Sequence, residues 1–371
     1  MNIYIINCFD TYEHRVDLLM RAFEEKGHSV KVLTSDFKHI EKVAVKEKKN
    51  SFIYFHAEPY SKNLSIKRMR SHIEISSKIF DYIVNNIDDI DVIWCLVPPN
   101  TFVRDAAKVK RRFPNIKVIL DFIDLWPETM PLKGLKNIWP CTEWRRRRSN
   151  YVSCADHVVT ECGLFRKRLK NEIKNVDSTV LYLARDIDFI PSIPELPPDR
   201  IALCYLGSIN NIIDIECISE IIRQIVSDHT VELNIIGDGE KREELITSAQ
   251  NAGAEVLYHG KIYDASEKQK IFDRCHFGLN IMKQTVCVGL TMKSMDYFEA
   301  GLPIINNIHG DTWSFVDKLG IGVNFDDTLD ISGVLSNNLK IRKKVREFYK
   351  SNFASEIFSQ KVNEIIDSLY P

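Results

Sequence analysis

Short apolar runs alternate with amphipathic segments along this chain, and the alternation occurs twice. Each run is continuous rather than period-two, which is typical of strands buried on both faces of a parallel sheet. Strands that alternate with helices form βαβ units, so the first half is predicted to be a doubly wound parallel sheet. The strands expected there are 2–8, 29–35, 51–57, 91–97, 116–122, 157–161 and 179–183.

A proline-rich stretch interrupts this alternation. Pro191, Pro194, Pro197 and Pro198 are too many for a helix or a central strand. A chain of 371 residues also exceeds the usual size of one domain. We therefore predict an α/β protein with two Rossmann-like, doubly wound parallel-sheet domains, the first over 1–185 and the second over 201–353, joined by a linker over 186–200. The second set of strands is expected to start at 201 and to continue at 231–236, 255–260, 277–281, 302–307 and 322–325.

The two halves carry opposite net charge although the whole chain is nearly neutral, at −1. Residues 1–185 hold 32 Lys and Arg against 23 Asp and Glu, a net +9, and the remainder is −10. A basic folded domain indicates an anionic partner, which is either a membrane surface or an acceptor that bears phosphate. Nucleic acid is not expected, because no recognised binding module is present.

Cysteine usage and hydropathy point to the cytoplasm. The nine Cys include no Cys-x-x-Cys pair, which favours reduced thiols over a disulfide framework or a zinc site. No apolar run approaches the roughly 20 residues of a membrane span, and the chain starts with a strand-like segment instead of a signal peptide.

The stretch 289–303 carries the clearest chemical signal. Thr291 is a good helix N-cap and Gly301 a natural stop, so the pattern predicts a loop, a short helix and a strand. Lys293 and Asp296 are three residues apart and share a helix face near the exposed N–H groups of the helix start. A cation and a helix N-terminus suit a diphosphate, and a carboxylate suits a ribose diol. The alternative is an ordinary surface ion pair between the two side chains.

Gly-Leu-Thr-x-Lys-x-x-Asp-Tyr-x-x-x-Gly-x-Pro, read from 289 to 303, resembles the donor-nucleotide motif of the GT-B glycosyltransferases. The likeness is greatest to the family 4-like enzymes of bacterial surface and capsular polysaccharide synthesis. It implies that Asp296 holds the ribose hydroxyls and that Lys293 faces the diphosphate. It also implies a last helix, over 354–371, that crosses back to the first domain. Many members carry a Glu eight residues before the acid, where this chain has Val288.

Two glycine turns and a strand end match further positions of the resemblance. The turn that starts at Gly207 follows the first strand of the second domain, and Gly tolerates a close ligand there. Family members usually place Arg and Lys after this Gly, where this chain has Ser208 and Asn210. The alternative for each glycine is an ordinary βα turn. The donor-binding residues predicted in this way are Gly207, Ser208, Asn210, Gly237, Gly239, Lys261, Ile262, Gly289, Leu290, Thr291, Lys293 and Asp296.

The first domain offers an acidic turn at the end of a buried strand, over 121–128. Ligands of parallel sheets bind beyond the carboxyl ends of the strands, so Asp124 is a candidate to receive the proton of an attacking hydroxyl. Trp126 and Glu128 are candidates for binding the acceptor. The alternative is that Asp124 caps the turn and Trp126 fills the core. Asp-Leu-Trp-Pro-Glu also resembles a recurrent stretch of the same family.

Three more regions of the first domain are candidate contacts. A cationic helix start preceded by a Tyr, over 60–72, is a candidate site for an acceptor's phosphate or headgroup, and the alternative there is a solvated face. In the loop after the first strand, the resemblance makes Tyr12 and Arg15 acceptor-side residues and brings His14 to the transferred sugar as a catalytic candidate. Two Trp and four Arg within 139–148 suit an interface with anionic lipid. The alternative there is a helix whose Arg side chains pair with Asp and Glu.

These patterns predict a hexosyltransferase that uses a nucleotide diphosphate sugar. The acceptor would be lipid-linked or an oligosaccharide, at the cytoplasmic face of the cell membrane. The resemblance implies retention of configuration, and we predict no metal and no cofactor beyond the donor, because no acidic cluster has metal-ligand spacing. Two alternatives remain open: a GT-B nucleotide-sugar epimerase, and a non-catalytic GT-B subunit that binds a partner transferase. A dehydrogenase is disfavoured, because residues 7–15 contain no Gly-x-Gly-x-x-Gly.

Overall fold

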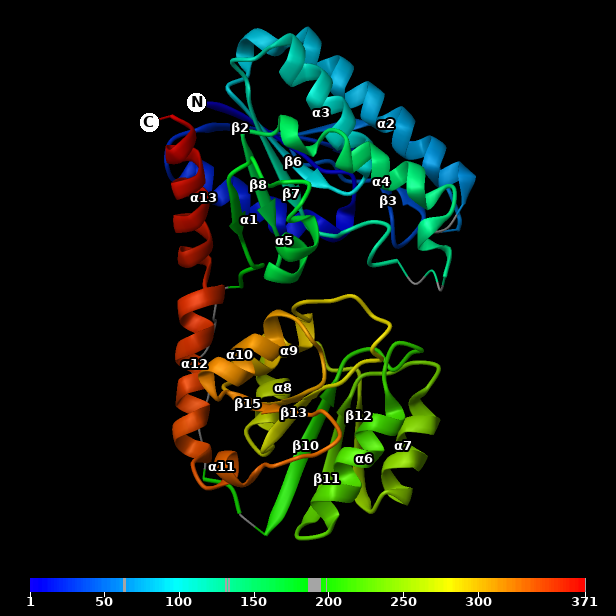
Figure 1. Ribbon diagram of the computed structural model, residues 1–371, viewed down its shortest axis with the longest axis vertical. Helices are drawn as coiled ribbons and strands as arrows, with labels where there is room; N and C mark the ends of the chain where they lie inside the picture. The colour runs from blue at the N-terminus through cyan, green and yellow to red at the C-terminus, as the bar shows by residue number, and fades with distance from the viewer. Residues whose placement is uncertain (63–64, 131, 133, 186–194, 198, 371) are drawn as a thin grey trace. The chain divides into compact units, whose positions relative to one another are not determined.

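The computed structural model describes residues 1–62, 65–130, 132, 134–185, 195–197 and 199–370. The chain forms two compact units. The first contains 1–184 together with 355–371, and the second contains 185–354. Most of the predicted linker, 186–200, lies outside the described residues. Figure 1 traces the chain through both units.

The first unit is built on a parallel sheet that has seven strands in the described residues, in the order β5-β2-β1-β6-β7-β8-β9. Its strands are β1 (Asn2–Ile6), β2 (Ser29–Ser35), β5 (Phe52–Phe55), β6 (Val92–Val97), β7 (Lys117–Phe122), β8 (His157–Thr160) and β9 (Ser178–Val180). A small antiparallel ribbon lies beside it, formed by β3 (Phe37–Lys38) and β4 (Val43–Ala44).

Helices cover both faces of this sheet, as Figure 1 shows. Helices α2 (Ile66–Asn85) and α3 (Asn100–Arg112) pack on one face, and α1 (Glu13–Glu24) and α13 (Ser355–Leu369) pack on the other. Strand side chains alternate between the two cores, so that Tyr4 and Ile6 face one and Ile3 and Ile5 the other. Two shorter helices, α4 (Cys141–Ser149) and α5 (Gly163–Leu169), complete the unit, with short 3-10 turns at Asp10–Tyr12, Ile87–Asp89, Leu135–Asn137 and Val152–Cys154.

The second unit repeats the architecture with a parallel sheet that has six strands among the described residues, ordered β12-β11-β10-β13-β14-β15. The strands are β10 (Arg200–Leu206), β11 (Thr230–Ile236), β12 (Ala254–Gly260), β13 (Phe277–Asn280), β14 (Ile304–Asn306) and β15 (Gly322–Asn324). The helices are α6 (Ile215–Val226), α7 (Arg242–Asn251), α8 (Ala265–Phe272), α9 (Met292–Glu299), α10 (Asp311–Leu319), α11 (Ser332–Leu335) and α12 (Asn338–Phe353).

Helix α9 approaches its sheet closely because one strand residue has no side chain. A Cβ on Gly278 of β13 would lie 2.6 Å from the ring of Tyr297. The Tyr297 hydroxyl accepts a hydrogen bond from the Leu206 N–H and donates one to the Cys204 carbonyl, both in β10. These contacts fix the helix that carries Lys293 and Asp296 against the end of the central strand.

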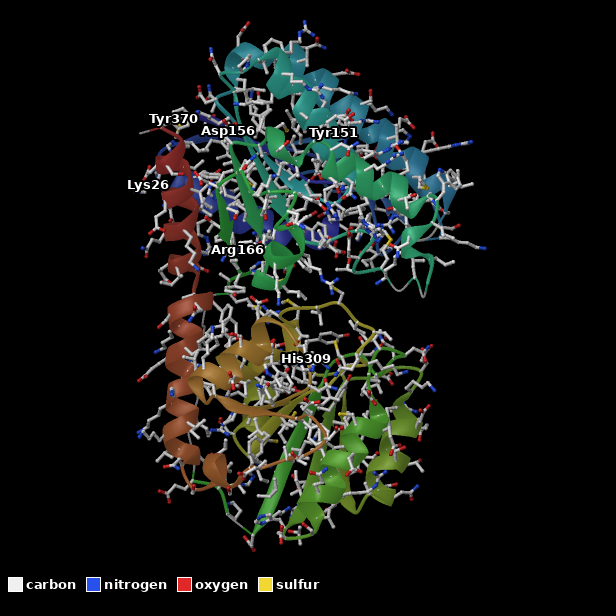
Figure 2. The ribbon with its side chains drawn as sticks, viewed as in Figure 1. Lys26, Tyr151, Asp156, Arg166, His309 and Tyr370 are labelled. Carbon is white, nitrogen blue, oxygen red and sulfur yellow. The ribbon has the colours of Figure 1, made fainter. Side chains whose placement is uncertain are left out.

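The end of the chain is two helices, not one. Ala354 is extended, with ψ 149°, and separates α12 from α13, which agrees with a last helix that starts near 354. Phe358, Val362 and Ile366 of α13 join the core of the first unit. Tyr370, labelled in Figure 2, follows α13 and donates a hydrogen bond to the Asp91 carbonyl in the same unit. The predicted return of the last helix to the first domain is therefore confirmed.

The predicted fold class is also confirmed, because both units are doubly wound parallel sheets. Strand 29–35 matches its prediction at both ends, and the other strands differ from theirs by a few residues. Within the part of the chain that the structure describes, no helix combines the length and apolar character needed to cross a bilayer.

Candidate functional site

The loop before α9 is held by a capping network at the carboxyl end of β13. The Thr291 hydroxyl accepts the Ser294 N–H at 3.1 Å, and the Ser294 hydroxyl in turn accepts the Thr291 N–H, which forms a capping box. Thr291 also donates to the Asn280 side-chain oxygen at 2.7 Å. The helix start that the sequence predicts is thus tied to the sheet.

Asn280 belongs to a ladder that the sequence did not reveal. Asn280, Asn306 and Asn324 are register partners at the ends of three neighbouring strands. The Asn280 amide donates to the Asn306 oxygen and the Asn306 amide to the Asn324 oxygen, both at 2.8 Å. The three positions are 26 and 18 residues apart, so only the sheet register brings them together. The ladder fixes the strand ends from which the α9 loop departs.

Lys293 lies at the end of β10, beside the Gly207 loop. Its ammonium is 4.5 Å from the centroid of the Tyr205 ring, and the residue is only 9% exposed. The Tyr205 hydroxyl donates to the Ser208 carbonyl at 3.0 Å. Burial lowers the pKa of Lys293 to about 8. A cation held near a loop of backbone N–H groups can bind an anion there.

Asp296 has different surroundings on the same helix. Its carboxylate pairs with Arg185 at 2.7 Å and lies 3.8 Å from the Lys268 ammonium. No ion pair joins Lys293 to Asp296 in the described residues. The alternative, in which the two side chains pair with each other at the surface, is therefore wrong. Arg185 and Lys268 were missed by the sequence reasoning, because they lie 111 and 28 residues from their partner.

The glycine turns at the ends of β10 and β11 pack backbone against backbone. A Cβ on Gly237, whose φ is +145°, would lie 1.9 Å from the Gly207 carbonyl oxygen. A Cβ on Gly239 would lie 2.2 Å from the Ile209 carbonyl oxygen. Packing between the two loops is therefore sufficient to require glycine at 237 and 239. Gly207 differs, because its φ is +117° and the space around its absent Cβ is open.

The remaining predicted donor residues surround the same strand ends with varied exposure. Asn210 accepts the Ile212 N–H and shapes its own turn. The Gly289 carbonyl accepts both the N–H and the hydroxyl of Thr312, which anchors the α9 loop to α10. Ser208 and Lys261 are exposed, and Ile262 and Leu290 are partly buried.

The first unit contains a cavity of about 400 Å³ at the carboxyl ends of its strands. It brings together three predicted residues, Tyr12, Asp124 and Trp126. The lining is completed by Phe9, Thr11, His39, Ile40, Arg68, Thr129 and Met130. Arg68 belongs to the basic helix start, 60–72, for which the sequence suggests an acceptor's phosphate or headgroup. His39 was not predicted, because it lies outside the motifs that the sequence analysis identifies.

Asp124 both lines the cavity and caps its own turn. One carboxylate oxygen accepts the Leu125 N–H and the Thr129 hydroxyl, and the other accepts the Trp126 indole N–H at 2.7 Å. Burial raises the pKa of Asp124 against these hydrogen bonds, which lower it. Asp124 therefore caps its turn, as the alternative interpretation expects, and it also lines the cavity.

The structure corrects the prediction that Arg15 binds the acceptor. Arg15 is 2% exposed and holds the buried Asp121 carboxylate through two hydrogen bonds of 2.8 Å. A third hydrogen bond goes to the Leu181 carbonyl. Its charge is thus used inside the core of the unit. His14 lies within 2.7 Å of the Ala184 carbonyl and is not among the residues that line the cavity.

Glu128 and the Arg-rich segment are joined by ion pairs. Glu128 pairs with Arg145 and with the buried Arg148, and these partners lower its pKa despite burial. Arg148 also binds Glu172. Arg147 pairs with Glu143 on α4. Three of the four Arg therefore pair with acidic side chains, as the alternative interpretation expects, and Glu128 anchors α4.

Glu161 was missed, although it directly follows β8 at the carboxyl end of the sheet. Burial raises its pKa to about 7, with Arg15 opposing the shift and Asp124 adding to it. A carboxyl group that titrates near neutrality is able to exchange a proton at physiological pH. Its place at a strand end was a usable signal in the sequence.

Comparisons with known proteins support the fold assignment. No protein-family model matches the sequence, and no curated protein matches it. Among solved structures, the chain is similar to a sucrose-phosphate synthase from Thermosynechococcus elongatus, with TM-score 0.69, 14% identity and coverage of 100% of this chain and 99% of the other. It is similar to HepE from Anabaena in complex with UDP, with TM-score 0.66, 11% identity and coverage of 99% and 100%. It is also similar to the lipopolysaccharide outer core galactosyltransferase WaaB, with TM-score 0.66, 13% identity and coverage of 99% of each chain. The architecture is the GT-B fold.

Proposed function

We propose that this protein is a glycosyltransferase that moves a hexose from a nucleotide diphosphate sugar to an acceptor bound in the first unit. The observation that carries the proposal is the buried Lys293 beside the Gly207 loop, at the sheet end where a nucleotide diphosphate would bind. The similar HepE structure contains UDP at this fold, and WaaB is named a galactosyltransferase. These likenesses support a nucleotide-sugar donor.

Lys293 and the backbone supply the electrostatic part of the chemistry. As the glycosidic bond breaks, negative charge accumulates on the departing diphosphate. The protonated Lys293 and the N–H groups at the α9 start would neutralise that charge. Because Lys293 is buried, its attraction to the diphosphate is stronger than that of an exposed ammonium.

Asp296 would hold the ribose hydroxyls, in exchange for part of its contact with Arg185. A carboxylate accepts hydrogen bonds from both hydroxyls of a diol. The ion pair keeps the carboxylate oriented before the donor arrives. Arg185 then remains close to the nucleotide as an added cation.

The acceptor would occupy the cavity lined by Tyr12, Asp124 and Trp126. Its attacking hydroxyl loses a proton during transfer, and Asp124 is the carboxylate of the cavity wall. The motif resemblance favours retention of configuration and a lipid-linked or oligosaccharide acceptor of surface polysaccharide synthesis. In that setting the hexose would be added at the inner face of the cell membrane.

An exposed apolar segment of the first unit supports contact with that membrane. Trp139 is 71% exposed and its neighbours Ile138 and Leu135 are about half exposed. An exposed Trp beside basic residues suits the headgroup region of a bilayer. Trp139→Ser should reduce sedimentation with anionic liposomes, and Trp144→Phe, inside the core, should not. Equal sedimentation of wild type and Trp139→Ser would contradict this part of the proposal.

The donor site is tested by titrating the protein with UDP-, GDP-, TDP- and CDP-sugars in a calorimeter. We expect one nucleotide class to bind, and Lys293→Met to weaken it about 10- to 100-fold through loss of a charge-assisted contact. Asp296→Asn, which keeps the side-chain shape, should weaken it about tenfold. Lys318→Met, an exposed lysine on α10, is the matched control and should bind normally. Undiminished affinity in both site variants would reject the site.

Turnover separates the two alternatives from the proposal. An epimerase would convert the donor without an acceptor, and a non-catalytic subunit would bind the donor without any turnover. A transferase releases nucleoside diphosphate in proportion to acceptor. We also expect activity to survive excess EDTA, and its loss, with recovery on adding Mg²⁺ or Mn²⁺, would contradict metal independence.

A further inference from the structure

We propose that the cavity of the first unit recognises a negatively charged group of the acceptor, a phosphate or a carboxylate, through Arg68. This inference rests on the proposed function, in which the first unit holds the acceptor. It adds the chemical class of that acceptor, which would be an anionic sugar unit.

Arg68 is a buried cation in the wall of the cavity. It is the third residue of α2, and its N–H donates to the Ser65 side chain that caps the helix. The residue is only 4% exposed, yet it lines the cavity. Helix, cap and burial hold the side chain in place before a ligand binds, which limits the entropy lost on binding.

Aromatic rings surround the guanidinium. Its central carbon lies 4.3 Å from the centroid of the Trp126 ring and 5.6 Å from those of Phe9 and Tyr60. Its Nε donates to His72 at 3.4 Å. A guanidinium that lies on ring faces keeps its N–H donors at its edge, where they match the paired oxygens of a carboxylate or phosphate.

The charges near Arg68 leave room for an anion. Lys42 adds a second cation, with its ammonium 4.8 Å from the centroid of the Tyr60 ring. Burial and the nearby Arg68 charge lower the pKa of His39 to about 4, so that imidazole is neutral at pH 7. Of the nearby carboxylates, Asp124 already accepts three hydrogen bonds, and Asp10 accepts one from the backbone N–H of His39.

Burial makes the Arg68 charge costly, and an anion offsets that cost. Burial is the largest influence on its pKa and lowers it. In a poorly hydrated wall the attraction between this cation and a ligand anion is stronger than at an open surface.

The size and lining of the cavity fit a sugar unit. Its volume of about 400 Å³ is at the lower end of the roughly 300 to 1,000 Å³ of small-molecule sites. Tyr12 and Thr129, which line the cavity, offer a ring and a hydroxyl for the sugar ring. The predicted ligand is therefore a hexose that carries a phosphate or a carboxylate, either free or at the end of a longer acceptor.

The experiment compares glucose 6-phosphate, glucuronate and glucose as probes of the full-length protein. Binding is followed by ligand-observed NMR and by calorimetry. We expect one or both anions to bind at least about tenfold more tightly than glucose, and the better of the two identifies phosphate or carboxylate. Equal binding of all three probes, or preference for glucose, would overturn the proposal.

Two variants test whether Arg68 is responsible. Arg68→Met retains apolar packing on Trp126 and should lose the preference for the anion, whereas Arg68→Lys should retain part of it. The matched control is Arg111→Met, because Arg111 also lies over a ring, that of Tyr151, labelled in Figure 2, but does not line the cavity. An unchanged preference in Arg68→Met would overturn the assignment. If the Met variant does not fold, a reduced preference in Arg68→Lys supports the assignment, and an undiminished preference there overturns it.

Donor titrations on the same samples distinguish this inference from the proposed function. Arg68→Met should bind the nucleotide sugar as tightly as wild type. If no nucleotide sugar binds wild type while the anionic hexose still requires Arg68, the proposed function fails and the anion site stands. If the donor binds and the anionic hexose does not, only the present inference fails.

Discussion

The carboxyl ends of the parallel strands carry different kinds of residues in the two units. In the first, the strand ends carry charged side chains that are largely committed to buried partners, as Asp121 is to Arg15 and Glu128 to Arg148. In the second, the strand ends carry glycine turns and an asparagine ladder, and Lys293 stands out as a buried cation over a ring. The difference shows that charged residues of an acidic motif at a strand end can be held by buried partners, so that such a motif does not by itself identify a binding site.

The largest expected effect tests whether Arg15 is structural. Arg15→Met should lower the free energy of unfolding by about 3 to 5 kcal/mol, because the fully buried Asp121 carboxylate then lacks its cation. Urea denaturation measures the change. Lys38→Met breaks an exposed pair with Glu41 and should cost less than about 1 kcal/mol. Near-normal stability of Arg15→Met with lost transferase activity would instead make Arg15 a functional residue.

Next in size is the glycine contact of the second unit. Gly237→Ala should cost about 2 to 4 kcal/mol, since its Cβ would meet the Gly207 carbonyl oxygen and its φ is positive. Gly320→Ala is the control, because its φ is +56° but nothing lies near its Cβ, so it should cost about 1 kcal/mol. Thermal or urea denaturation of the two variants measures the loss in the free energy of unfolding for each. Equal costs would mean that the two loops do not pack as tightly as described.

The raised pKa of Glu161 predicts that the free energy of unfolding of the first unit depends on pH. Its pKa in the folded protein is about 7, above the ordinary 4.5, so its stabilising effect is present below pH 4.5 and is lost as pH rises through 7. Glu161→Gln should remove a fall of about 1 to 3 kcal/mol in the free energy of unfolding between those pH values. Glu24→Gln, at an exposed position of α1, should leave the fall intact. The same pH profile in wild type and Glu161→Gln would refute a raised pKa.

The smallest effect concerns the charge of Lys293 at the donor site. Because its pKa is about 8, donor affinity should be highest below pH 8 and should fall by up to tenfold for each pH unit above it. A nucleotide sugar is the suitable probe, since its diphosphate diester does not titrate in this range. Lys293→Arg should make calorimetric affinity nearly independent of pH from 7 to 9.5. A wild-type profile that is already flat would count against contact between Lys293 and the diphosphate.

The sequence predicted what depends on neighbours along the chain. The strand 29–35, the Thr291 cap and the Gly301 stop follow from local pattern and backbone preference. It failed where a side chain is committed to a distant partner. Arg15 and Asp121 are 106 residues apart, and the two motifs that contain them do not say that they bind each other. The Asn280 ladder was missed for the same reason, because only the assembled sheet brings its members together.

Because α13 follows Ala354 at the end of the described chain but packs in the first unit, it affects the order in which the two units complete their folding. The second unit is inserted within the first, whose core requires Phe358, Val362, Ile365 and Ile366 from the last helix. While the ribosome is still translating residues before 355, the first unit exposes the apolar surface that this helix will cover. The unit made first is therefore the one completed last, and nascent chains stalled before residue 355 should be the ones that chaperones retain.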